Sequence, residues 1–395
     1  MLKPLSSYWD GIKQAMTRHG DMLLFLLAIT VLLLMFFRPN SGKPIIQQSE
    51  IVFTHFWTDD KDREILFSRA DEFEKLRKKT KISFIEKFYE ELRNELYYGT
   101  DSQSDPQIPA RRADLLVLDT LWVPDLMKEK KIETITGESI SSINVLFYNI
   151  DILKKAGYSK PPDSRGEFIL YCKKAYETEK DNPPLGLAID LDKSRGVYDD
   201  IYPWIWAAGT QLIKDGIPAF NTRQLGESLS FLLSLHNEGL ILPEGDKLEN
   251  FIKGRAAFMT APACTAGYIS DQMGADSFGI TSVPRPDNFM GKSFFAGTAW
   301  IFAVSSESSR REEAKYFAEF LMGKEPFLSG VPQLFQSKLT DIEISGETAK
   351  DFTGLEGVYE LGEIFRDELA DLFSGKSSGT GAAENIHKRW QEQLQ

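Results

Sequence analysis

Short apolar runs alternate along this chain with longer segments in which apolar residues recur every third or fourth position. The short runs, rich in β-branched and aromatic residues, predict strands, and the longer spacing predicts helices that bury one face. We expect strands at 51–57, 81–86, 113–118, 144–148, 185–189, 256–260, 278–283 and 299–304. We expect helices at 89–98, 123–129, 151–156, 166–177, 225–238 and 309–322, one that follows Thr58 and Asp59, and a helix start at 200–208.

The order of these elements predicts an α/β fold. Residues 113–118 (ADLLVL) form a nearly continuous apolar run, which is typical of a strand buried on both faces of a parallel sheet. Strand and helix alternate on either side of it, as in a doubly wound lobe. Because 395 residues exceed what one ordinary core accommodates, we expect two lobes.

The N-terminal region contains the longest apolar segment. Residues 22–37 (MLLFLLAITVLLLMFF) carry no charge, although this segment is slightly shorter than the about 17–25 residues of a spanning helix. Bulky Met35, Phe36 and Phe37 stand where a signal peptide carries small residues, and no cysteine follows for a lipid anchor. We therefore interpret the segment as an uncleaved transmembrane anchor; a cleaved signal and a buried soluble helix are the alternatives.

The flanks of this segment complete the expected N-terminal organisation. Residues 1–21 form a cytoplasmic or interfacial stretch, because a weak excess of basic residues points the N-terminus inward. Residues 38–50 are polar and contain Gly and Pro, so they read as a linker. The chain would thus be a single-pass protein of a bacterial inner membrane, with its main domain on the periplasmic or extracellular side.

Composition narrows the function classes. The net charge of −12 argues against a nucleic-acid partner, because phosphate binding needs clustered basic residues. The four histidines are widely spread, and no metalloprotease, redox or nucleophile-elbow motif is present, so we expect neither an enzyme nor a metal or other cofactor. Cys172 and Cys264 are either two buried thiols or a disulfide, and the sequence leaves both open.

Several segments resemble the extracellular solute-binding proteins of sugar importers, the group that includes maltose-binding protein. The most specific is 145–168 (VLFYNIDILKKAGYSKPPDSRGEF), which is similar to the "lyYNkdlfkkaGl-kPP-tw-E" signature. Residues 56–58, 113–132 and 254–260 (GRAAFMT) resemble other family segments, as does the C-terminal part from Pro332. The resemblance is colinear over about 340 residues.

The resemblance implies a two-lobe periplasmic-binding-protein fold of type II, which closes on its ligand by hinge motion. Lobe one would comprise 50–140 plus 284–323, and lobe two 141–283 plus 324–395. The crossovers between the lobes would lie near 137–143, 279–284 and 323–326. Such proteins usually act as monomers.

Candidate ligand contacts follow from sugar chemistry and from family position. A sugar offers apolar C–H faces to flat aromatic rings and a rim of hydroxyls to polar side chains. Tryptophans at strand ends and helix starts suit this role, although core packing is the competing interpretation of each one. The candidate residues are Trp57, Thr58, Asp59, Asp119, Trp122, Trp204, Trp206, Gly297, Trp300 and Tyr359.

Two departures from the family pattern weaken the expectation of an ordinary sugar ligand. Only twelve residues, 133–144, lie where most members carry twenty or more with a hairpin. The stacking tryptophan that follows the "GkaAM" strand is replaced by Ala261-Pro262-Ala263-Cys264. The resemblance as a whole implies a membrane-anchored protein that captures a carbohydrate or related solute for the permease subunits of an ABC importer. The two departures motivate the alternative, a membrane-fixed sensor or envelope structural partner.

Overall fold

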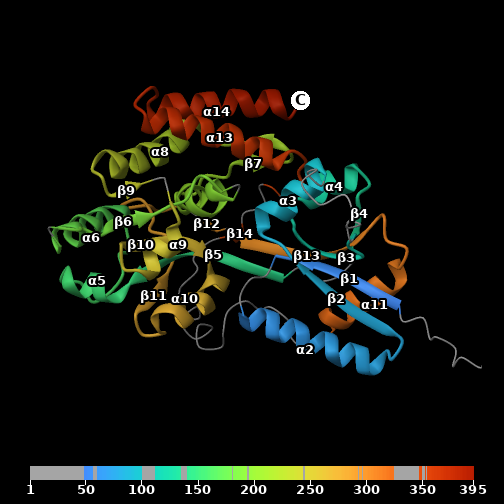
Figure 1. The fold of residues 1–395 in the computed structure, drawn as a ribbon. Coiled ribbons are helices and arrows are strands. Elements are labelled where there is room, and N and C mark those ends of the chain that lie inside the picture. Colours follow the sequence, from blue (N-terminus) through green and yellow to red (C-terminus); the bar gives the residue numbers. More distant parts are fainter. Residues whose placement is uncertain are drawn as a thin grey trace, which may run out of the picture. The chain divides into compact units, whose positions relative to one another are not determined.

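Buried strands form the centre of the domain and helices lie over them (Figure 1). Residues 50–395 form one compact unit in the computed structural model. Among the described residues, no helix is both long enough and apolar enough to span a membrane. The expected anchor, 22–37, lies outside these residues. The structure describes 49–56, 60–99, 112–134, 140–179, 181–193, 195–242, 245–291, 293–295, 297–323, 347–348, 352 and 354–395.

One part of the main sheet has the strand order β2-β1-β3-β13. Strand β1 pairs with β3 in parallel, with Phe53 opposite Leu115, and β13 runs antiparallel to β3. A short strand, β4, also pairs with β13. The strands are β1 (Ser49–His55), β2 (Thr80–Glu86), β3 (Leu115–Asp119), β4 (Ile132–Thr134) and β13 (Gly297–Ser305).

The other part has the order β5-β10-β6-β9, with β11 also paired to β5. Strands β10, β6 and β9 are parallel, whereas β5 is antiparallel to both β10 and β11. The strands are β5 (Ile140–Asn149), β6 (Leu185–Ala188), β9 (Ile241–Leu242), β10 (Ala256–Pro262) and β11 (Phe278–Thr281).

Strand β5 connects the two parts because it changes partner along its length. Its first residues pair with β13, ending with Ile143 opposite Gly297. The next residue, Asn144, pairs with Pro262 of β10. A single strand therefore belongs to both parts of the sheet, at the place where the resemblance puts the first crossover.

Separate hydrophobic cores lie on the two parts of the sheet. The first core combines β1, β3 and β13 with four helices. These helices are α2 (Asp60–Leu76), α3 (Tyr89–Tyr98), α4 (Val123–Lys128) and α11 (Arg311–Met322). The second core lies among β6, β10 and their covering helices, with a smaller cluster between β5, β10, β11 and two short helices.

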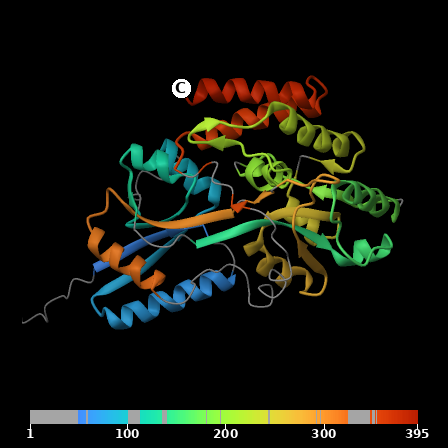
Figure 2. The same ribbon diagram turned by 180° about the vertical axis from the view of Figure 1, so that it is seen from behind.

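The covering helices of the second core lie on opposite faces of its sheet. Helices α8, α13 and α14 stack on one face, and α10 lies on the other, as seen from both sides in Figures 1 and 2. The helices are α5 (Ile150–Lys155), α6 (Arg165–Glu177), α7 (Tyr202–Ala207), α8 (Thr222–Asn237), α9 (Lys247–Ile252), α10 (Ala266–Met273), α13 (Val358–Phe373) and α14 (Gly379–Gln393).

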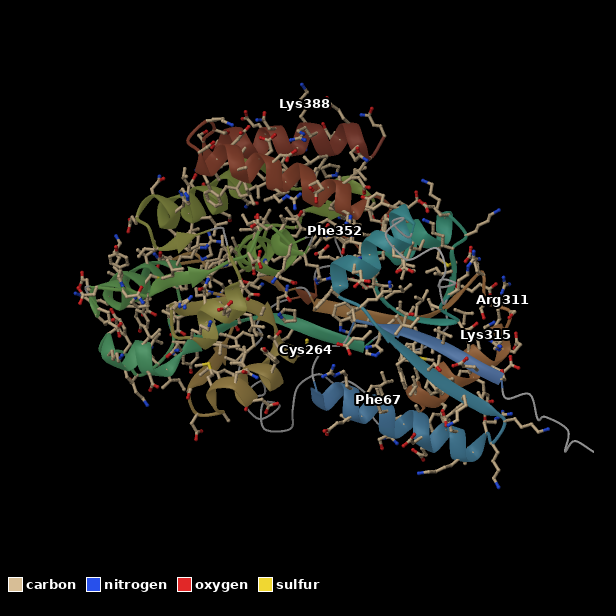
Figure 3. The ribbon with its side chains drawn as sticks, viewed as in Figure 1. Phe67, Cys264, Arg311, Lys315, Phe352 and Lys388 are labelled. Atoms are coloured by element: carbon tan, nitrogen blue, oxygen red, sulfur yellow. The ribbon has the colours of Figure 1, made fainter. Side chains whose placement is uncertain are left out.

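Most expected elements are confirmed within a few residues, and the helix at 89–98 has the predicted bounds. The stretch 200–208 differs: a π-helical turn, Val197–Ile201, leads into α7, with Pro203 in its first turn. The structure shows no disulfide in the part it describes. Cys172 is buried on α6, and Cys264 lies in the single turn Ala263–Thr265 after β10 (Figure 3).

Candidate functional site

The sheet register places two of the expected ligand contacts side by side. Asp119 is the last residue of β3, and Trp300 lies opposite it on β13. The Asp119 side chain is buried and the Trp300 side chain is partly exposed. Ligands of open α/β sheets bind beyond the carboxyl ends of the strands, and this pair lies at such an end.

The carboxylate of Asp119 is held by three donors from different segments. The backbone N–H of Leu121 donates to Oδ1 at 2.9 Å. The Tyr89 hydroxyl donates to Oδ2 at 2.7 Å, and the guanidinium of Arg195 donates to the same oxygen. With these partners and an exposed fraction of 1%, the Asp119 side chain is held in place by the protein itself.

Arg195 precedes the π-helical turn and forms a second ion pair within it. Its Nε and Nη2 donate to the two carboxylate oxygens of Asp199 at 3.3 and 3.2 Å. The guanidinium also lies 5.7 Å from the ring centroid of Trp300. Burial alone would lower the pKa of Arg195, but Asp119 and then Asp199 raise that pKa well above its ordinary value. The site thus contains one permanent cation between two carboxylates.

Phenol and indole groups extend this network on the side of the first core. The hydroxyls of Tyr89 and Tyr359 lie 2.6 Å apart, and the indole N–H of Trp122 donates to the Tyr359 hydroxyl at 2.7 Å. Burial, followed by the charge of Asp119, raises the pKa of both tyrosines. Both phenols are therefore neutral donors and acceptors at physiological pH.

The other residues expected to contact a ligand differ in how far they are buried and in where they lie in the fold. Trp122 and Tyr359 join the network, but neither side chain is more than 2% exposed. Trp204 and Trp206 lie inside the second core, where Trp204 packs on Phe168 with ring centroids 4.8 Å apart. Gly297 begins β13 at the crossing with β5. Trp57, Thr58 and Asp59 lie outside the described residues.

Sequence reasoning missed Arg195, Asp199 and Tyr89. Arg195 follows a predicted strand, in a loop without a recognised motif. One signal was available, since Gly196 follows Arg195 directly. A Cβ at Gly196 would lie 2.1 Å from the carbonyl oxygen of Asp190, so the glycine lets this loop pack closely against the segment that follows β6.

The network is suited to recognition by hydrogen bonds and ring stacking. Its groups are carboxylates, a guanidinium, phenols and one partly exposed indole, all fixed by neighbours. In the part of the chain that the structure covers, no group of three His, Cys, Asp or Glu side chains could hold a metal ion.

Comparison with known proteins agrees with the fold described above. The family model for bacterial extracellular solute-binding proteins matches residues 137–329. A Brucella abortus protein described as a binding protein is 22% identical over 250 residues, 54% of this chain. The alignment spans 59% of that relative's length.

Solved structures share the arrangement over almost their whole length. An ABC transporter solute-binding protein from Thermotoga lettingae, bound with α-D-tagatose, has a TM-score of 0.70 at 16% identity, covering 88% of this chain and 100% of that one. The maltose/maltodextrin-binding domain of Bdellovibrio bacteriovorus, bound to maltotriose, has a TM-score of 0.68 at 18% identity, covering 87% and 99%. The GacH receptor of Streptomyces glaucescens scores 0.68 at 15% identity, covering 88% and 98%. Together the family match and the shared two-lobe fold confirm the resemblance of this chain to the bacterial extracellular solute-binding proteins.

Proposed function

We propose that this chain is a membrane-anchored substrate-binding protein that captures a carbohydrate between its two lobes and presents it to an ABC importer. The observation that carries the proposal is the position of Trp300. Its partly exposed ring lies beside Asp119 and near the Arg195 guanidinium, where the first core meets the segment from the second. The ring supplies a stacking face, and the Arg195 guanidinium, 12% exposed, is a polar group beside it; a sugar requires both kinds of group.

Trp300 is the strongest stacking candidate among the aromatic side chains described at the expected positions. Trp122, Trp204, Trp206 and Tyr359 are at most 2% exposed, so each would have to leave its packing to meet a ligand. The ring of Trp300 packs edge-on against Phe56, with centroids 4.9 Å apart, which holds it in place. A fixed ring loses little conformational freedom on binding.

The test is sugar binding by the full-length chain in detergent, measured by thermal shift and calorimetry across neutral mono- and oligosaccharides. Trp300→Ala is expected to weaken affinity by about tenfold or more, because it removes the stacking face. Tyr176→Ala is the matched control, since Tyr176 is an aromatic residue 45% exposed on α6, away from the network. A sugar that binds both variants equally well would contradict the assignment of Trp300.

A second candidate is a membrane-fixed sensor or envelope structural partner, and the burial of Asp119 favours it. The Asp119 carboxylate is 1% exposed and has three protein donors, so it is satisfied without a ligand. This candidate predicts no sugar-induced thermal shift in the wild-type chain. Permease genes beside the gene for this chain would favour import, and their absence would favour the second candidate.

A further inference from the structure

The ion pair between Arg195 and Asp119 joins segments that belong to different cores. Asp119 ends β3, whose residues Leu115–Leu118 pack in the first core. Arg195 leads into the turn Val197–Ile201, whose apolar residues pack in the second core. The contact therefore connects the two lobes of the fold directly.

The backbone that carries Arg195 is fixed to the second core. Gly196 lies so close to the segment that follows β6 that an added Cβ would come within 2.8 Å of the Cα of Leu191, a residue of the second core. The carbonyl of Arg195 also accepts the N–H of Asp199 at 2.9 Å. Because the Arg195 backbone is held on the second core, a separation of the lobes is expected to break this ion pair.

The ion pair between Arg195 and Asp119 also lies near β5, the strand that connects the two lobes. Strand β5 changes from β13 to β10 between Ile143 and Asn144. The amide of Asn144 lies 3.5 Å from Oδ1 of Asp199, and donates to the carbonyl of Tyr198 at 3.3 Å. The triad of Asp119, Arg195 and Asp199 thus lies where β5 passes from one part of the main sheet to the other.

We propose that Arg195 is a latch that holds the two lobes of this chain together in the absence of a ligand. In the arrangement observed, the side chains of Asp119 and Arg195 are 1% and 12% exposed. A carboxylate buried to that degree is strongly disfavoured without a counter-charge. Without the guanidinium, the Asp119 carboxylate must take up a proton or reach water, and opening of the lobes gives it access to water.

The latch is independent of the identity of any sugar. It requires only the two-lobe fold and the observed triad, and it goes beyond the proposed transport function. A chain that binds no sugar can still be latched, and a sugar-binding chain can close without Arg195. The two proposals can therefore fail separately.

The test is the distance between two spin labels, one on each lobe, in the full-length chain in detergent without ligand. Leu76→Cys on α2 and Leu170→Cys on α6 provide exposed positions, at 67% and 58%. Cys264→Ser is included throughout because Cys264 is partly exposed. Arg195→Gln is expected to shift the distribution to longer distances, and Asp119→Asn to shift it less, because the latter leaves no unpaired buried carboxylate at position 119.

Arg389→Gln is the matched control. Arg389 also pairs with two carboxylates, Glu368 and Asp367, each at 3.0 Å, but all three lie within α13 and α14 of the second core. This variant is expected to keep the wild-type distance. A folded Arg195→Gln protein with the wild-type distance would overturn the proposal. Loss of the native circular dichroism in both Arg195→Gln and Asp119→Asn would also overturn it, because the pair would then maintain the fold itself.

Discussion

Asp200 is a titratable side chain that the fold buries completely. It lies in the π-helical turn. Burial raises the pKa of Asp200 to about 6, and the nearby charge of Asp199 adds to this rise. The ammonium of Lys247 and the backbone N–H of Asp190 both act in the opposite direction and lower the pKa. Thr260 donates a further hydrogen bond at 3.3 Å.

The raised pKa gives a pH dependence of stability with a definite sign. The folded chain keeps a proton on Asp200 up to about pH 6, whereas an unfolded chain loses it near 3.8. The folded state therefore binds more protons in this window, and its contribution to stability falls as pH rises from about 4 to 6. Thermal unfolding of wild type and Asp200→Asn should show the stability of wild type falling relative to that of the variant over this range. Parallel profiles would contradict the expected shift.

The sequence predicted which types of residue would meet at the candidate site better than which individual residues would meet there. Asp119 and Trp300, two of the expected ligand contacts, lie side by side at a strand end, and an acidic residue after a buried strand and a tryptophan in a matching strand are visible in sequence. Trp204 and Trp206 have the same residue type and similar neighbours, yet they pack in the second core. Burial of a tryptophan depends on which helices cover it, and that is a property of the tertiary structure. Arg195 was missed because its role depends on a partner 76 positions away.

At the scale of elements, α8 and α14 pack closely against each other because α8 has a glycine, Gly226, at the contact. A Cβ at Gly226 of α8 would lie 2.9 Å from the Cα of Thr380 and 3.2 Å from the carbonyl oxygen of Gly379. Both neighbours are backbone atoms of α14 that cannot rotate away. The close approach brings Ala382, Ala383 and Trp390 of α14 into the second core.

Gly226→Ala is therefore expected to lower the free energy of unfolding. Overpacking at a rigid contact costs about 1–3 kcal/mol, which exceeds the gain of about 1 kcal/mol from alanine in a helix. Gly362→Ala on α13 is the matched comparison, because its Cβ would meet the Tyr198 ring, a side chain, at 3.3 Å. Chemical denaturation should rank Gly226→Ala as the less stable variant. Equal stability would show that α14 shifts to accommodate the methyl group.

Elements were predicted more accurately where pattern and local signals agree. Helix α6 begins after Ser164, whose hydroxyl accepts the N–H of Glu167, and the pattern located it within one residue. The turn at Val197–Ile201 was not predicted, because all five of its residues are buried and no amphipathic period marks it. The pairing of β5 with both parts of the main sheet was also not predicted, because the hydrophobic pattern of one strand does not show which strands it pairs with.

At the scale of the whole molecule, the apolar segment 22–37 predicts association with lipid. Arginine near the centre of a spanning helix costs about 2.5–3.5 kcal/mol per residue. Leu27→Arg combined with Leu32→Arg should therefore release the chain from liposomes in a flotation assay. Gln47→Arg combined with Gln48→Arg adds the same charge in the linker and should leave flotation unchanged. Flotation of the first variant at the wild-type level would contradict the anchor.

The position of β13 has a consequence for how the chain is made. This strand lies between β3 and β5 in the sheet, yet it comes from residues 297–305, after every strand of the second lobe's sheet. While a ribosome synthesises the chain, the backbone groups of β3 and of the first residues of β5 that pair with β13 lack this partner until β13 has been made. Unpaired strand edges are templates for pairing with other chains. We therefore expect the yield of native protein to depend on protection of the nascent first lobe rather than on the stability of the finished molecule.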